Sequence, residues 1–363
     1  MPKTKLASSV ELSFEEPELF VHMYDFAVEI TDEFCQIAFP GAFHPAFLLV
    51  KLYHILLSVI SMGSIIYFFL NYSNLLAFHF NIKILFFFQF CSCFLQSATL
   101  AISQTHHLVL ALIANGPCDV ILAPALFALF NLPLIFSMLC MEFSQVLMVI
   151  ERTLASCLFV CYEKTTKTIG FVLTSFAVIV PGLTCLYMYY DDKFNYPQMS
   201  AMATSPSSKL RINYIFITIN VLNVLTLMHS IGLYRHNKQK INMVKGRDHF
   251  ILSSRFQMNE NVSSSKLLWR LSCAQLIIFL LYGCAMYSLR IFLPGERSAV
   301  WQAVTEFCYT PPLYCAIMPL ICIVCAQNSL KQRNSKVQSL ITLRSVGQEG
   351  WDNYQGMLQK QWE

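Results

Sequence analysis

The chain has 363 residues, of which 56% are hydrophobic and 13% are charged. Soluble domains usually carry about 25% charged residues, so this composition argues against a soluble enzyme and favours a protein that lies mainly within a membrane. The formal net charge is +4, and no basic block is long enough to indicate a nucleic-acid partner.

Seven apolar runs dominate the sequence, and most of the charged residues lie outside them. The runs cover residues 46–70, 83–103, 121–150, 168–190, 212–234, 271–289 and 301–326. A helix that spans a bilayer needs about 20 mostly apolar residues, so each run is about long enough for one crossing. We therefore predict an all-α membrane protein in which residues 46–326 form a bundle of seven transmembrane helices.

The segments that flank the runs predict the orientation. The N-terminal segment 1–45 is acidic and contains no signal-peptide core, so we expect no cleaved signal. Most lysines and arginines outside the runs lie in the loops 151–167 and 235–270 and in the tail 327–363. Because these residues favour cytoplasmic loops, we expect segment 1–45 to be extracellular and the tail to be cytoplasmic.

Two kinds of residue interrupt the apolar runs. Prolines fall within the third, fourth and seventh runs, at Pro124, Pro133, Pro181 and Pro319, and an interior proline removes a backbone hydrogen bond and kinks a helix. Glu142 lies deep in the third run, close to the predicted bilayer midplane. An intramembrane acid is a candidate functional residue, although a hydrogen-bonded structural carboxyl explains it equally well.

The inner end of the third run carries a specific pattern. It ends in the pair Glu151-Arg152, and Ala155 and then Tyr162-Glu163 follow. An arginine stays charged and can exchange a carboxylate partner for other acceptors. In this respect the acid–arginine pair resembles the conserved switch of G-protein-coupled receptors.

Two further stretches extend this resemblance. They are Ser254-Arg255-Phe256-Gln257 with Glu260-Asn261 in the third inner loop, and Pro117-Cys118-Asp119 before the third run. The pattern at the end of the third run resembles the ER…A…YE motif of nematode serpentine chemoreceptors of the Sra superfamily. The inner-loop stretch resembles the RYQ..EN motif of the same group, with Phe256 where tyrosine is usual, and the stretch before the third run is also similar to the group. The alpha/beta class, Srab, is the most similar, and the Sre and Srb classes share overlapping motifs.

The resemblance implies both a fold and a function. The fold is the seven-helix bundle of the G-protein-coupled receptor type, with the N-terminus outside and the C-terminus cytoplasmic. The function is that of a chemosensory receptor in the plasma membrane of sensory-neuron cilia, which binds a small-molecule ligand and signals to a heterotrimeric G protein. We expect no enzymatic activity, cofactor or metal. The implied switch and coupling residues are Glu151, Arg152, Tyr162, Glu163, Arg255, Gln257, Glu260 and Asn261.

The predicted outer halves of the runs hold the candidate ligand-binding residues. Pockets in helix bundles lie between helices and combine apolar walls with a few polar anchors. The polar candidates are Gln104, His106, His107, Asn213, Tyr282, Tyr287, Glu306 and Tyr309. An interhelical hydrogen bond explains each of them equally well. We expect His106 and His107 to be an exposed loop pair rather than a metal site or a pH sensor.

Two more expectations concern the ends of the bundle. The receptor resemblance implies a disulfide from the top of the third helix, but the loop 191–210 contains no cysteine. This leaves Cys185 and Cys35 as the candidate partners of Cys118. In the tail, apolar and basic residues interleave over 330–341 and predict a short amphipathic helix on the inner membrane surface.

Other seven-span proteins remain as alternatives. An odorant-gated channel subunit of the insect type would have its N-terminus inside, opposite to the charge bias. A membrane hydrolase needs catalytic residues that converge at one depth, whereas the histidines here are scattered and no HxxxH pair lies in a run. A transporter favours inverted repeats, and the sequence shows no repeat.

Overall fold

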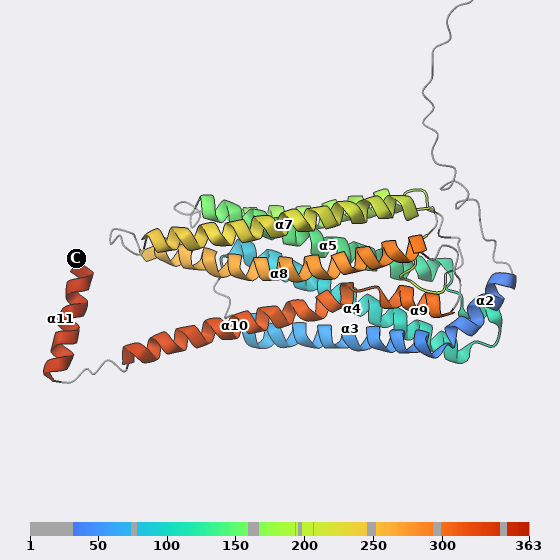
Figure 1. Ribbon diagram of the computed structural model, residues 1–363, viewed down its shortest axis with the longest axis horizontal. Coiled ribbons are helices and arrows are strands. Elements are labelled where there is room, and N and C mark those ends of the chain that lie inside the picture. Colours follow the sequence, from blue (N-terminus) through green and yellow to red (C-terminus); the bar gives the residue numbers. More distant parts are fainter. Residues whose placement is uncertain are drawn as a thin grey trace, which may run out of the picture.

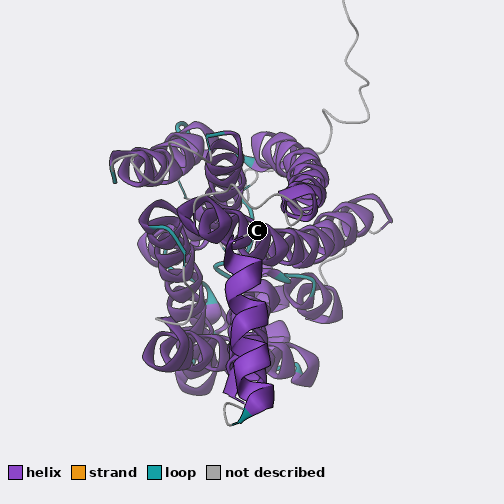
Figure 2. Ribbon diagram, turned by 90° about the vertical axis from the view of Figure 1, so that its left-hand side faces the viewer, coloured by secondary structure: helices purple, strands orange, loops and turns teal. Residues whose placement is uncertain are grey.

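A computed structural model gives the arrangement of the chain. It describes residues 32–73, 78–158, 167–192, 194, 198–205, 207–244, 252–292, 299–341 and 347–362. Within these ranges almost every residue is helical and there is no β-strand, apart from one isolated bridge between Leu122 and Gln198. The long helices lie side by side in an elongated bundle (Figure 1), and the perpendicular view shows them end-on (Figure 2).

Seven helical segments of the described chain are long and apolar enough to cross a membrane. They are α3 (Pro45–Tyr72), α4 (Phe80–Ile113), α5 (Pro124–Cys157), α6 (Thr168–Tyr189), α7 (Lys209–Val244), α8 (Leu252–Phe292), and α9 (Ala299–Phe307) together with α10 (Pro311–Ile341). The prediction of an all-α bundle of seven spans is therefore confirmed. Each segment corresponds to one apolar run.

The seventh run is two helices rather than one. α9 ends at Phe307 and α10 begins at Pro311-Pro312. Proline fits the first turn of a helix, but it cannot donate the backbone hydrogen bonds that would continue α9. The hydroxyl of Thr310, in the break, donates to the carbonyl of Ile278 on α8 at 2.9 Å. The break is thus held against a neighbouring helix.

Two expectations about helix ends are wrong. Pro124 does not interrupt the third span but begins α5, where a backbone N–H would have no helical partner in any case. The other three prolines, Pro133, Pro181 and Pro319, do lie inside helices. The amphipathic helix expected over 330–341 is not separate, because α10 continues through these residues to Ile341. No glycine or proline stands between Ala326 and Ile341 to end it. A further helix, α11 (Gln348–Trp362), follows.

The bundle has two ends, which we name by the elements that lie there. We call the end near α2 (Asp32–Ala42) and the 3₁₀ turn η2 (Pro117–Val120) the disulfide end. We call the opposite end, where α5 terminates and α8 begins, the Arg152 end. In Figure 1, α2 and α9 mark the disulfide end, and α10 and α11 extend beyond the other.

Candidate functional site

Arg152 is the centre of a buried polar cluster near the end of α5. Its side chain is 1% exposed, and all three guanidinium nitrogens donate hydrogen bonds. Nε and Nη2 donate to the Glu151 carboxylate, the latter at 2.6 Å. Nη1 lies 3.3 Å from Glu260 Oε1 and 3.4 Å from both Asn261 Oδ1 and Ser264 Oγ on α8. The cluster therefore joins the end of α5 to α8.

Glu260 extends this cluster to a third helix. Its carboxylate also accepts a hydrogen bond from the backbone N–H of His79, which caps the start of α4. Asn261 donates in turn to the carbonyl of Ala155 at 3.3 Å. Removing one partner of a buried ion pair typically costs about 3–5 kcal/mol, because the other charge stays buried. The cluster can thus hold the starts of α4 and α8 against α5.

The structure brings together half of the predicted switch residues. Glu151, Arg152, Glu260 and Asn261 meet in the cluster described above. Arg255 and Gln257 belong to the first turns of α8, on the same end of the bundle. Tyr162 and Glu163 lie outside the described residues.

A cavity of about 270 Å³ opens at the disulfide end. It lies between α3, α8, α9 and the segment 198–203 that precedes α7. Three predicted pocket residues line it: Tyr282, Glu306 and Tyr309. The other lining residues are Phe47, Gln198, Met199, Ser200, Met202, Ala203, Met286, Trp301, Gln302 and Thr305. The walls are mainly apolar, as in most small-molecule sites.

The remaining pocket candidates lie elsewhere. His106 and His107 are not an exposed loop pair, because α4 continues to Ile113; His107 is buried and the His106 ring packs on Phe130. Asn213 on α7 does not line the cavity. Tyr287 is 65% exposed on α8. Among the described residues, no group of three or more His, Cys, Asp or Glu side chains has the arrangement of a metal site.

The cavity wall contains one member of an ion pair that the sequence did not predict. Lys51 on α3 is 2% exposed and its Nζ lies 3.6 Å from Glu306 Oε2; Glu306 on α9 is 4% exposed. The same Nζ donates to Gln104 Oε1 at 3.3 Å and lies 4.0 Å from the centre of the Phe47 ring. Gln104, a predicted pocket residue, thus supports the cavity through Lys51. A lysine inside the first apolar run was the available signal, since buried lysines normally have a partner.

Hydrogen bonds link the cavity to the middle of α5. The Tyr309 hydroxyl accepts from Gln96 Nε2 on α4 at 2.6 Å, and Gln96 Oε1 accepts from Ser137 on α5. Two turns along α4, Gln89 repeats this pattern with the Tyr314 hydroxyl, at 3.1 Å, and with Ser144. The two glutamines form a ladder from the cavity toward the Arg152 end.

Glu142 lies on α5 between Ser137 and Ser144 in the sequence, and its side chain faces the interface between α7 and α8. It is fully buried and faces Asn223 and Gln275. Gln275 Nε2 also donates to Asn223 Oδ1 at 3.4 Å. The acid therefore points into the bundle, as expected for an intramembrane carboxyl. Its functional role stays a prediction.

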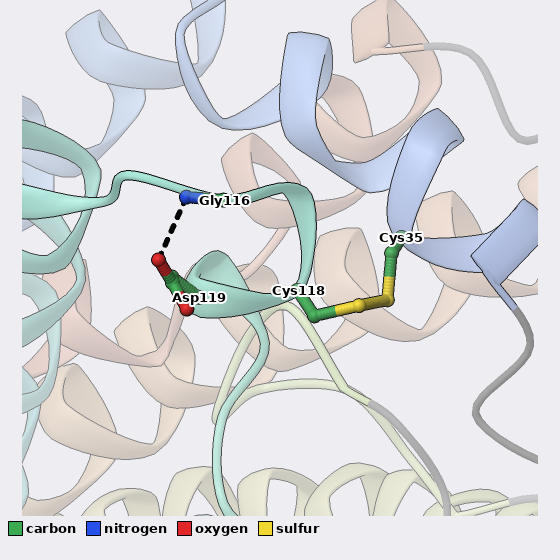
Figure 3. Close-up of a disulfide and its surroundings, with 4 residues drawn as sticks. All are labelled: Cys35, Gly116, Cys118 and Asp119. Carbon is green, nitrogen blue, oxygen red and sulfur yellow. Dashed lines mark hydrogen bonds between the residues drawn. A yellow bond between two sulfur atoms is a disulfide. The ribbon is translucent and has the colours of Figure 1, made fainter.

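The disulfide end is closed by a bond between Cys35 on α2 and Cys118 in η2, with the two Cα atoms 4.8 Å apart (Figure 3). Asp119 stabilises the turn, since its Oδ2 accepts from the backbone N–H groups of Gly116 at 2.7 Å and Asn115 at 3.0 Å. Of the two partners considered for Cys118, the structure pairs Cys35. Cys185 is a free thiol on α6.

These features define a class of protein. Seven membrane-spanning helices, with a buried acid–arginine cluster at one end and an apolar cavity at the other, give a multi-pass membrane protein of the G-protein-coupled receptor fold type. Comparison with known proteins identifies the family. Residues 42–363 match the model of the serpentine type 7TM GPCR receptor class ab chemoreceptors, and the chain belongs to this family.

Several curated relatives are similar over nearly their whole length. Serpentine receptor class beta-6 of Caenorhabditis elegans is 24% identical over 89% of this chain and 95% of its own. Serpentine receptor class beta-16 of the same species is 26% identical over 91% and 96%. The resemblance to the Sra superfamily is thereby confirmed, and the family supports a chemosensory receptor.

Proposed function

We propose that this receptor binds a small-molecule ligand in the cavity at the disulfide end and activates a heterotrimeric G protein at the Arg152 end. The observation that carries the proposal is the Arg152 cluster, which ties α5 to α8 through a buried guanidinium. Arginine can leave such acceptors for those of a docked partner. In the resting receptor the cluster holds α4, α5 and α8 together at the surface where the G protein docks.

The same proposal assigns the two sides of the membrane. The lysine- and arginine-rich loops put the Arg152 end in the cytoplasm. A disulfide suits an oxidising exterior, and the bond between Cys35 and Cys118 lies at the opposite end. The plasma membrane of sensory-neuron cilia is the location that fits a chemosensory role.

The glutamine ladder gives a route by which ligand binding reaches the G-protein side. Tyr309 both lines the cavity and accepts from Gln96, whose other contact is Ser137 on α5. Displacement of Tyr309 by a ligand therefore alters its hydrogen bond with Gln96 on α4, and through Gln96 it affects Ser137 on α5, the helix that carries Arg152. Coupling between sites requires an element with two arrangements, and we assign this role to α5.

Substitution of Arg152 tests the proposal. Arg152→Ala abolishes G-protein activation, measured as nucleotide exchange on Gα subunits of each major class, while enough receptor persists at the surface for comparison with the wild type at equal receptor density. The matched control is Lys238→Ala, which removes an exposed cation on α7 and leaves exchange unchanged. Full signalling by the Arg152 variant, at equal surface expression, refutes the switch role.

An epitope tag at Met1 tests the orientation. Staining of intact, unpermeabilised cells is expected, because the N-terminal segment is assigned to the outside. A tag that becomes accessible only after permeabilisation contradicts this assignment and favours the channel alternative.

A further inference from the structure

We propose that the cavity selects a neutral, largely apolar ligand that carries a hydroxyl group, and that this hydroxyl donates a hydrogen bond to Glu306. This inference rests on the proposed function, because it names the class of ligand for the same cavity. Three properties of the site carry it: unused acceptors, a balanced charge and apolar walls.

The unused acceptors lie on one face of α9. Glu306 lines the cavity, and the Lys51 ammonium, 3.6 Å from Oε2, pairs with it by charge from just beyond hydrogen-bond distance, so neither carboxylate oxygen has a described donor within that distance. Gln302 lines it as well, and its buried Oε1 is likewise without a donor in the described chain. The two residues are four positions apart, so their side chains neighbour each other on the helix. Buried acceptors without donors are unfavourable, and a ligand with an O–H group can satisfy one of them.

The charge of the site favours a neutral ligand. Among the described residues that line the cavity, Glu306 is the charged one, and the buried ammonium of Lys51 balances its carboxylate at 3.6 Å. A protonated amine would add a second cation beside this pair, and a carboxylate would add a second anion. Either ion would lose its hydration without a counter-charge, which is strongly unfavourable in a buried site. A hydroxyl supplies the donor and adds no charge.

The apolar walls determine the chemistry and the size of the rest of the ligand. Phe47, Trp301 and the thioethers of Met199, Met202 and Met286 surround the space, and methionine adapts readily to different apolar shapes. The volume of about 270 Å³ lies just below the range of about 300–1,000 Å³ found for drug-sized sites. A compact aliphatic alcohol therefore fits both the size and the chemistry.

Trp301 in the cavity wall provides a direct readout. A brominated alcohol, 7-bromo-1-heptanol, quenches Trp301 when it binds, and the signal is read from purified receptor in lipid nanodiscs. The Trp301→Phe variant measures quenching of the other tryptophans by probe dissolved in the bilayer. The matched probes are 1-bromo-7-methoxyheptane, which lacks the donor, 7-bromoheptylamine and 7-bromoheptanoic acid.

We expect saturable, Trp301-dependent quenching by the alcohol, with at least tenfold weaker binding of the ether, the amine and the acid. The double variant Lys51→Met/Glu306→Leu removes both charges of this pair, so neither is left buried without its partner, and folding is protected while the acceptor is lost. This variant should lose most of the preference for the alcohol over the ether and keep at most the fewfold preference that Gln302 supplies. Gln302→Leu, which keeps the ion pair, should reduce the preference for the alcohol by only a fewfold.

Three outcomes overturn the inference: equal binding of alcohol and ether by the wild type, tighter binding of the amine or the acid, or an unchanged preference in the double variant. In each of these outcomes, Trp301-dependent quenching shows that the cavity still binds small molecules. Only the proposed class of ligand is then wrong. If none of the four probes gives Trp301-dependent quenching, the ligand class and the cavity both fail. G-protein coupling is tested separately by Arg152→Ala.

Discussion

The two ends of the bundle each contain a buried pair of opposite charges, but they satisfy those charges differently. At the Arg152 end, all three guanidinium nitrogens donate to acceptors on α5 and α8. At the disulfide end, Lys51 and Glu306 lie 3.6 Å apart, and the carboxylate oxygens accept no hydrogen bond from the described residues. The first arrangement is complete by itself, whereas the second has room for another molecule.

The difference follows from the side chains. Arginine presents a planar fork of donors that can serve several acceptors at once, whereas lysine is a compact charge on a flexible stem. Arg152 also has its main partner next to it in the same helix, Glu151. Lys51 and Glu306 meet only through the packing of α3 against α9. A complete cluster suits a resting contact that a partner must break, and an incomplete one suits a ligand anchor.

The largest effect should come from breaking the disulfide end. Cys35 and Cys118 are separated by 83 residues, and closing a loop of that length stabilises a fold by up to about 4.5 kcal/mol. Cys118→Ser should therefore lower the melting temperature strongly and reduce surface expression. Cys185→Ser, which removes a free thiol, is the control. Equal melting of the Cys118 variant and the wild type would show that the bond does not stabilise this end.

A smaller effect should come from the Arg152 end, where α6 approaches α4 at Gly170. A Cβ at this position would lie 2.9 Å from Asn81 Cα and from Ile84 Cγ2, and such overpacking typically costs about 1–3 kcal/mol. Gly182, on the same helix, has no atom within 4 Å of its Cβ position. Gly170→Ala should lower the melting temperature, and Gly182→Ala should not.

This pair of variants also reports on signalling, because Asn81 is two residues beyond His79, whose N–H donates to Glu260. The Gly170 variant should therefore change basal nucleotide exchange as well as stability. If both alanine variants melt like the wild type, the close contact between α4 and α6 is not present in the membrane.

The smallest effect should be a pH dependence at the disulfide end. Burial acts to raise the pKa of Asp192, but hydrogen bonds from Ser205, Ser208, the backbone of Phe194 and Ser207 outweigh it and lower the pKa below its ordinary value of 3.8. A carboxyl whose pKa is lowered by folding stabilises the fold above the unfolded-state pKa, and this contribution is lost as the pH falls through the folded-state value. The side chain is only half-buried, so solvent screening limits the contribution to below about 1 kcal/mol.

Asp192→Asn measures this contribution. At pH 7 the variant should melt about 1–2 °C below the wild type. The difference should shrink steadily once the pH falls below about 4, near the ordinary pKa of an aspartate. A difference that stays constant between pH 7 and pH 3 would mean that the hydrogen bonds do not depend on the ionised carboxylate.

The sequence predicted the membrane spans well because each span is a long apolar run, and apolar length is a local property. It did not predict that α7 continues to Val244, or that α8 starts as early as Leu252. Polar residues outside the bilayer are compatible with either a loop or a helix. It also missed the break before Pro311, where hydropathy is continuous. Hydropathy reports where lipid contacts the chain, and helix ends depend on capping and on proline.

For the site, the sequence identified residues better than it identified contacts. The motif resemblance grouped Arg152 with Glu260 and Asn261, and the structure brings them within 3.4 Å. The pocket was harder, because a polar residue in an apolar run gives no sign of its partner. Lys51 and Glu306 are 255 positions apart in the sequence, and only the helix packing joins them.

Basal nucleotide exchange in the Glu151→Gln variant tests the central claim most directly. If the Arg152 cluster holds the receptor at rest, removing the carboxylate charge beside Arg152 should raise basal exchange about fivefold or more, measured with reconstituted receptor and G protein and no ligand. Asp352→Asn, in α11 and outside the cluster, should leave it unchanged. Basal exchange in the Glu151 variant equal to that of the wild type, at equal receptor density, would contradict the account.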